Sequence, residues 1–173
     1  VFIPTFNEEK NISKKIKRLK FFKKIIVLDS YSTDKTINLA KKFSNVEIKK
    51  LKFKGYVKKL NSCIKLCKTK WIMIIDADYL LSQSLIKSIL KKISNSDYSG
   101  FKTKIYFNVM KTIIKEDIYP SKIIIFKKSK GYFKKKGHKE NLEIKGKIKY
   151  LNGYILHEDK KNFKRWFDGQ LSI

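Results

Sequence analysis

Residues 71–78 read Trp71-Ile72-Met73-Ile74-Ile75-Asp76-Ala77-Asp78. Five apolar residues in a row are typical of a strand that is buried on both faces of a parallel sheet. Two carboxylates follow on the turn directly after that strand. In open α/β sheets, ligands bind at the carboxyl ends of the strands. This stretch therefore predicts both a buried central strand and a binding site beside its end.

Strands and helices alternate on the N-terminal side of this stretch. Apolar runs predict strands over residues 1–3, 25–28 and 46–51, and helical spacing of apolar residues predicts helices from residue 8 onward and over 34–43 and 57–66. A fourth helix follows Ser82. This alternation is typical of an α/β fold with a mostly parallel central sheet. The polar turns after the strands would then meet at one edge of that sheet.

The second half of the chain changes character. β-Branched and aromatic residues predict strands over residues 101–109, 122–126, 142–144 and 147–151. Residues 159–173 mix basic and aromatic side chains and predict an amphipathic helix. No Pro-rich or Gly-rich linker divides the chain, so we expect a single domain over residues 1–173. The sequence begins and ends inside expected elements, and we therefore expect a fragment of a longer protein that lacks both termini.

The net charge of +27 first suggests a nucleic-acid partner, because Lys and Arg neutralise phosphates. Of the 42 basic residues, however, only Arg18 and Arg165 are Arg, the side chain that makes paired hydrogen bonds to phosphate and guanine. The chain also holds 25 Ile and 2 Ala, which indicates a bias of composition toward Lys and Ile. We expect no nucleic-acid partner, although the positive field can still attract anionic sugars, nucleotides or lipid headgroups.

Other features of the composition narrow the class of protein further. Hydrophobic residues make up 42% of the chain, too many for a disordered basic tail. Cys63 and Cys67 are too few for a disulfide framework or a four-cysteine zinc site, and we expect them to be packing residues in a reducing compartment. No apolar run approaches the roughly 20 residues that cross a bilayer, and no signal peptide is recognisable. These features predict a folded domain that is soluble or membrane-peripheral.

The carboxylates of Asp76 and Asp78 are the sharpest chemical signal in the sequence. Two such groups on one turn can share a hard divalent cation that also binds diphosphate oxygens, or they can form an ordinary solvated turn. Asp29, after the second strand, could accept hydrogen bonds from a nucleobase or ribose, or could cap its own turn. Asn7 is a suitable N-cap for the first helix, with Glu8 and Glu9 in its first turn.

Four segments in this order and at these spacings resemble the family 2 glycosyltransferases with the GT-A fold, and specifically the branch of lipopolysaccharide-core glucosyltransferases. The segments are Val1-Phe2-Ile3-Pro4-Thr5-Phe6-Asn7-Glu8-Glu9, Ile26-Val27-Leu28-Asp29-Ser30-Tyr31-Ser32-Thr33-Asp34-Lys35-Thr36, Lys58-Lys59-Leu60-Asn61 and residues 71–78. Weaker similarity continues at residues 119–120, 137–140, 156–159 and 163–166. The resemblance implies a Rossmann-like nucleotide-diphospho-sugar transferase fold. Residues 1–95 would bind the nucleotide sugar, and a smaller mixed β half, residues 96–158, would hold the acceptor.

The resemblance also implies roles for individual residues. The residues around the nucleotide and its diphosphate would be Pro4, Thr5, Asn7, Glu8, Lys59, Asp76, Ala77 and Asp78. Asp29 would contact the uracil or equivalent base. Asp76, Asp78 and His157 would hold the divalent metal, Mg²⁺ or Mn²⁺. Glu140 would be the catalytic base that deprotonates the acceptor hydroxyl in an inverting transfer. Departures from the family pattern at Leu60 and at Ser121-Lys122 leave the acceptor contacts open. The role of His138 is open because Lys139-Glu140 aligns equally well with the His-Glu pair of the family.

Together these implications predict a metal-assisted, inverting glycosyltransferase of cell-envelope or lipopolysaccharide biosynthesis. The donor would be a nucleotide sugar, with UDP-sugars first, and the acceptor a saccharide or a lipid-linked glycan. We expect a cytoplasmic protein, with peripheral contact at the inner face of the membrane through residues 159–173. The alternatives are a basic nucleic-acid-binding protein and a non-catalytic relative that only binds nucleotide sugars.

Overall fold

The computed structural model describes residues 1–93, 97–109, 112–115, 120–137 and 139–158. Its first half holds three parallel strands in the order β1-β2-β3, each followed by a helix. The strands are β1 (Phe2–Thr5), β2 (Ile25–Asp29) and β3 (Val46–Lys50), and the helices are α1 (Ile12–Arg18), α2 (Thr36–Ala40) and α3 (Tyr56–Leu66).

The second half is built around a larger, mixed sheet with the strand order β4-β8-β6-β11-β5, and β7 pairs with β6. β6 and β11 are parallel, and the other pairs are antiparallel. The strands are β4 (Trp71–Met73), β5 (Tyr79–Leu81), β6 (Gly100–Val109), β7 (Thr112–Ile114), β8 (Lys122–Lys127) and β11 (Ile148–His157). A hairpin of β9 (Gly131–Lys136) and β10 (Lys139–Ile144), the helix α4 (Gln83–Lys92) and a 3₁₀ turn (Lys128–Lys130) complete the described elements.

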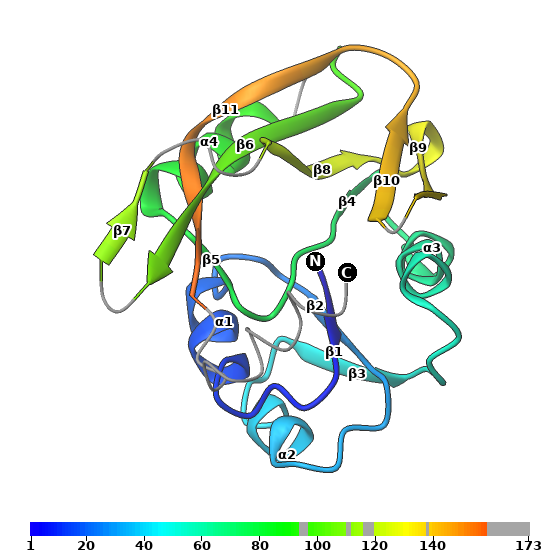
Figure 1. Cartoon of the computed structure of the whole chain (residues 1–173), viewed down its shortest axis with the longest axis vertical. Coiled ribbons are helices and arrows are strands. Elements are labelled where there is room, and N and C mark those ends of the chain that lie inside the picture. The colour runs from blue at the N-terminus through cyan, green and yellow to red at the C-terminus, as the bar shows by residue number, and fades with distance from the viewer. Residues whose placement is uncertain (94–96, 110–111, 116–119, 138, 159–173) are drawn as a thin grey trace.

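The segment from β4 to β5 joins the two halves and runs through the middle of the molecule (Figure 1). A parallel bridge between Phe2 and Ile74 connects the end of β4 to β1. Successive residues of this segment face opposite sides, because side chains alternate along a strand. Ile72 and Ile74 belong to one apolar core and Met73 and Ile75 to the other. Buried cores on both faces account for the unbroken apolar run in the sequence.

Each core is closed by different helices. Residues of α1 and α4 pack in the core on the Met73 side, whereas α3 and the β9–β10 hairpin cover the Ile74 side. Cys63 and Cys67 are free, buried thiols in the second core, in agreement with the packing role predicted for them. The described residues contain no helix long and apolar enough to span a membrane.

The α/β class, the parallel first half and the start of α4 directly after Ser82 agree with the sequence predictions. In the structure Ser82 caps this helix, since its Oγ accepts a hydrogen bond from Leu85 N at 3.2 Å. The N-cap predicted at Asn7 is wrong, because α1 begins at Ile12. Asn7 instead has a φ of 53°, and its side-chain oxygen accepts a hydrogen bond from Thr33 N at 2.9 Å. The short strands β5, β7 and β9 were not expected. The helix predicted over residues 159–173, like His138, lies outside the described residues.

Candidate active site

A pocket of about 470 Å³, the donor-side pocket, opens at the carboxyl ends of β1, β2 and β4. It brings together the family segment of residues 1–9 and the Asp76–Asp78 turn, although the sequence separates them by about 70 residues. The lining residues are Pro4, Thr5, Phe6, Glu8, Ser30, Phe53, Tyr56, Lys59, Asp76, Ala77 and Asp78. The pocket lies at the edge of the sheet where the sequence predicts that the polar turns meet.

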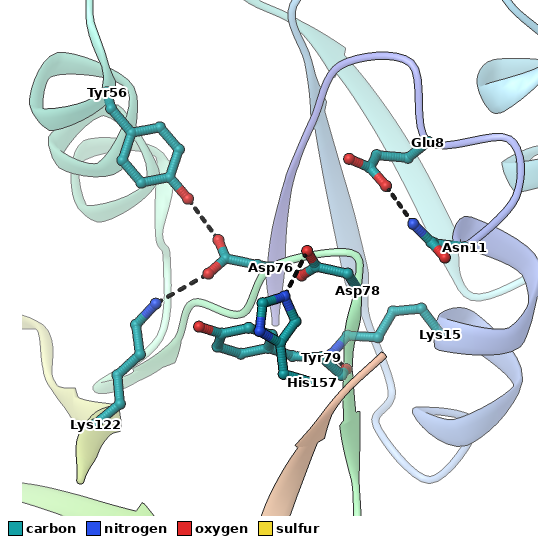
Figure 2. Close-up of polar contacts among 9 residues, drawn as sticks. All are labelled: Glu8, Asn11, Lys15, Tyr56, Asp76, Asp78, Tyr79, Lys122 and His157. Atoms are coloured by element: carbon teal, nitrogen blue, oxygen red, sulfur yellow. Dashed lines mark hydrogen bonds and ion pairs between the residues drawn. The ribbon is translucent and has the colours of Figure 1, made fainter. Parts of the chain in front are cut away.

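Two interlocked turns shape one wall of the donor-side pocket. Asn7 N donates to Ser32 Oγ at 2.9 Å, and Glu8 N donates to Thr36 Oγ1 at 2.7 Å. The Glu8 carboxylate is itself fixed by Asn11 Nδ2 at 2.9 Å (Figure 2). Asn7 does not line the pocket, and its side chain serves the contact between the turns instead.

Asp29 and Lys59 are both buried beside this wall, and of the two Lys59 lines the pocket. Asp29 is fully buried, accepts a hydrogen bond from Ser32 N at 2.9 Å and does not line the pocket. Its contacts match the turn-capping alternative. Lys59 Nζ donates to the Thr5 carbonyl oxygen at 2.7 Å. Burial lowers the pKa of Lys59, and the negative charge of Asp29 opposes that shift. Lys59 thus holds the β1 carbonyl at the pocket floor.

Asp76 is engaged on both of its carboxylate oxygens. Oδ1 accepts a hydrogen bond from the Tyr56 hydroxyl at 2.5 Å, and Oδ2 lies 2.9 Å from Lys122 Nζ (Figure 2). Burial would raise the pKa of Asp76, but the Lys122 charge and the Tyr56 hydrogen bond hold it below its ordinary value. Burial and the Asp76 carboxylate raise the pKa of Tyr56 well above 10. Asp76 is therefore an ionised anchor that connects α3 to β8.

Asp78 has a different environment, two residues further along the turn. Its Oδ2 lies 3.1 Å from His157 Nε2, whereas its Oδ1 is buried without a hydrogen-bond partner among the described residues (Figure 2). His157 Nδ1 is likewise buried without such a partner. The turn is fixed from behind, because Glu158 N donates to the Asp78 carbonyl at 3.0 Å and Lys15 Nζ donates to the Tyr79 carbonyl.

These contacts test the predicted metal site. A carboxylate oxygen and an imidazole are suitable ligands for Mn²⁺ or Mg²⁺ when a diphosphate supplies further oxygens. The unpartnered oxygen of Asp78 and the adjacent His157 ring fit such an ion, while Asp76 already has two protein partners. No group of three or more His, Cys, Asp or Glu side chains that could hold a metal occurs among the described residues. The protein residues present thus fit a metal bound jointly by the protein and its substrate.

Glu140 lies in a second pocket of about 470 Å³, the acceptor-side pocket, on the other side of Asp76. Asp76 and Tyr56 line both pockets, so the two spaces share a wall. Glu140 is partly buried on β10, and its charge acts on Lys122 and on both Tyr56 and Tyr79. A base beside the donor-side pocket but outside it is the arrangement that the predicted role of Glu140 requires.

Sequence reasoning did not assign Tyr56, Lys122 or Lys15 to the site. Lys122 was noted only as a departure from the family pattern, and nothing distinguishes it from 39 other lysines in the printed sequence. Lys15 occupies an inward-facing helical position and is fully buried, with its pKa lowered to about 7 by burial against the opposing charges of Asp76 and Asp78. A lysine on the apolar face of a helix was the available signal for it.

The family model described as Glycosyl transferase family 2 matches residues 1–157, most of the chain. The chain belongs to glycosyl transferase family 2. The match includes the turns of the donor-side pocket, the Asp76–Asp78 turn and both Glu140 and His157.

Two curated relatives illustrate the extent of similarity to this family 2 chain. The SPbeta prophage-derived glycosyltransferase SunS of Bacillus subtilis is 44% identical over 84 residues, which cover 47% of this chain and 20% of SunS. A glycosyltransferase of Rickettsia typhi is 34% identical over 108 residues, covering 60% of this chain and 37% of that protein. The chain therefore spans only a fifth to about two fifths of the length of these relatives.

Solved structures confirm the GT-A fold of this family 2 chain. A 1–349 fragment of Staphylococcus aureus TarS in complex with UDP-GlcNAc superposes with a TM-score of 0.70 at 17% identity, covering 93% of this chain and 58% of the fragment. The mannosyltransferase PcManGT of Pyrobaculum calidifontis, in complex with GDP-Man and Mn²⁺, gives a TM-score of 0.69 at 14% identity, covering 95% and 58%.

Proposed function

We propose that the protein transfers a sugar from a nucleotide-sugar donor to a saccharide or lipid-linked acceptor. The observation that carries this proposal is the shared wall at Asp76 between a donor-side pocket, built from the family segments, and an acceptor-side pocket that holds Glu140. Family membership and the nucleotide-sugar complexes of TarS and PcManGT support it.

The donor-side pocket would take the nucleoside diphosphate. Pro4, Thr5, Phe6 and Phe53 form a wall that suits a base and ribose, and the side chains of Phe6 and Phe53 are exposed for contact. The Asp76–Asp78 turn lines the same pocket, and the diphosphate would bind beside it. We take UDP-sugars as the first donors to test.

Asp78 and His157 would hold a divalent cation, Mg²⁺ or Mn²⁺, which supplies positive charge to the departing nucleoside diphosphate. Asp76 would act beside it without binding the ion, because Tyr56 and Lys122 occupy its oxygens. Lys122 adds positive charge beside the same turn, and Lys15 does so while its amine is protonated, since burial lowers its pKa to about 7.

Glu140 would remove the proton from the acceptor hydroxyl. As the acceptor oxygen bonds to the anomeric carbon, the bond from that carbon to the diphosphate breaks, and the proton passes to the Glu140 carboxylate. Attack from the acceptor-side pocket, opposite the departing diphosphate, inverts the configuration at the anomeric carbon. Glu140 must be ionised for this step.

We further propose where in the cell the reaction takes place. Similarity to the lipopolysaccharide-core branch favours a role in cell-envelope glycan synthesis at the cytoplasmic face of the membrane. The membrane contact was predicted for residues 159–173, which lie outside the described residues. Flotation of the full-length product with anionic vesicles tests it, and a protein that stays wholly in the soluble fraction contradicts it.

A donor screen tests the proposed function directly. UDP-, GDP- and dTDP-sugars are incubated with the protein, with and without Mn²⁺ or Mg²⁺, and released nucleotide is measured. We expect metal-dependent release from one class of donor. Release from none, together with nucleic-acid binding that weakens steeply with salt and that sugar nucleotides do not displace, would instead indicate the nucleic-acid alternative.

A further inference from the structure

The walls of the acceptor-side pocket differ in composition from the rest of this protein. Lys makes up 40 of the 173 residues, yet one of the 15 described residues that line this pocket is Lys, namely Lys122. The groove along the outer side of α3 shows the opposite composition, since five of its ten lining residues are Lys. The low Lys content of the acceptor-side pocket is therefore local and does not reflect the whole chain.

Among the described residues, the charges that line the acceptor-side pocket leave it net negative. Lys122 is neutralised by Asp76, with 2.9 Å between Nζ and Oδ2, and the second carboxylate of the pocket, Glu140, remains. An anionic group would thus meet repulsion here in a protein that attracts anions elsewhere.

The remaining wall of this pocket is apolar. Pro120, Ile123, Phe133 and Leu142 line it, together with the Tyr79 ring. Sugar rings carry apolar C–H faces that pack on such surfaces, while Asn141 and Ser121 offer hydrogen bonds to ring hydroxyls. An anionic substituent on the ring would lose its hydration against this wall, and no unpaired cation among the described lining residues would replace it.

We infer that the acceptor end that enters this pocket is an uncharged sugar ring, and not one that bears a phosphate or carboxylate. This inference rests on the proposed function and deepens it by naming the class of acceptor. Negative charge elsewhere on a longer acceptor is compatible with it, because the groove along α3 lies outside the acceptor-side pocket.

Matched pairs of ligands test the inference. The methyl β-glycosides of glucose and galactose are compared with the corresponding methyl glucuronide and galacturonide, which differ by one carboxylate. Binding to the whole protein is measured by saturation-transfer NMR titration with UDP and Mg²⁺ present. We expect a neutral ring to bind at least about tenfold more tightly than its uronide, the size of effect that like charges several ångströms apart produce near a protein surface.

Two variants locate the cause of this preference. Glu140→Gln should narrow the difference between a neutral ring and its uronide several-fold, because it removes the uncompensated charge of the pocket. Glu47→Gln is the matched control, since Glu47 lies on β3, outside the pocket, and its loss changes the net charge equally. The control should leave the preference unchanged.

Several outcomes would overturn the inference: uronides that bind as tightly as neutral rings, no neutral ring that binds while UDP does, or an equal effect of both variants. Failure of the proposed function gives a different result, namely absence of UDP and GDP binding in the wild-type protein. The two failures are therefore distinguishable in one set of titrations.

Discussion

Lys122 Nζ lies 2.9 Å from Asp76 Oδ2, so a residue at the start of β8 neutralises the first carboxylate of the Asp-Ala-Asp turn. Side-chain exposure is 33% for Lys122 and 24% for Asp76, and solvent therefore screens the pair only in part. Replacing Lys122 by Met leaves a partly buried carboxylate with the Tyr56 hydroxyl as its remaining partner.

We expect Lys122→Met to lower the free energy of unfolding by about 1–2 kcal/mol, the range for a charged group that loses one partner with some water access. Urea denaturation measures this value. Lys24→Met is the control, because Lys24 pairs with Glu47 at the surface and its loss should cost less than about 0.5 kcal/mol. Equal losses in the two variants would show that the contact with Asp76 stabilises the protein no more than an exposed ion pair does.

The two contacts of Asp76 also show what sequence could not supply. The Asp76–Asp78 turn was predictable because an apolar strand and two carboxylates are adjacent in the chain. Lys122 is 46 residues away, among 40 lysines, and its pairing depends on how β8 packs against β4. Tertiary contacts of this kind leave no local pattern.

Asp29 illustrates a second limit on prediction from sequence. Its position after a strand fits both a base contact and a turn cap. Ser32 N lies three residues along the same turn and reaches the carboxylate at 2.9 Å, so that the side chain is used within its own turn and is buried. The spacing of residues fits both alternatives. The contacts in the structure match the turn cap, and a base contact at Asp29 stays a prediction.

Glu140 is expected to act on the chemical step and not on nucleotide binding. Glu140→Gln should reduce sugar transfer by about 10²–10⁴-fold, the usual contribution of a general base, and leave the affinity for UDP or GDP within about twofold. Calorimetry and a transfer assay give the two values. Glu143→Gln is a control on the same strand, because Glu143 pairs with Tyr132 and Lys134 outside both pockets. Full activity in the Glu140 variant would contradict the assignment.

Asp78 is expected to carry the metal dependence of nucleotide binding. With Mn²⁺ present, Asp78→Asn should weaken UDP or GDP binding by about tenfold or more, because the amide is a poor ligand for a hard cation. With EDTA the variant and the wild type should bind alike. Asp97→Asn removes an exposed carboxylate elsewhere and should change neither value. An unchanged response to Mn²⁺ in the Asp78 variant would refute its role as a ligand.

Gly153 is expected to be essential to the packing of β11 on α4. Its φ is +105°, and an added Cβ would lie 2.4 Å from Leu85 N and 2.7 Å from Leu85 Cα. Backbone atoms cannot yield as a flexible side chain does. Gly153→Ala should therefore cost more than about 3 kcal/mol, combining strain and overlap.

Gly137 provides the comparison for Gly153. It also has a positive φ, +59°, but an added Cβ would have no neighbour within 4 Å among the atoms of the structure described. Gly137→Ala should cost about 1–2 kcal/mol from conformation alone. Thermal and urea unfolding of the two variants measure the difference, and similar losses would show that the contact with Leu85 is relieved by a small backbone shift.

Lys15 is expected to make the stability of this protein depend on pH in the alkaline range. Burial lowers its pKa from 10.5 to about 7 in the folded protein. Between these values the unfolded chain binds more protons than the folded one, so the free energy of unfolding rises with pH. The cost of burying the charged amine is present in full below about pH 7 and is relieved as the pH rises.

Comparison with Lys15→Met isolates this contribution, because Met fills a similar volume without a titrating group. The stability of the wild type relative to the variant should rise by about 2 kcal/mol between pH 7 and 9, since each pH unit in that window contributes at most about 1.4 kcal/mol. Urea unfolding at a series of pH values measures both proteins. Lys17→Met, on the exposed face of the same helix, should follow the wild type. Parallel pH profiles for wild type and Lys15→Met would mean that Lys15 keeps its ordinary pKa, with its ammonium group reaching water in solution.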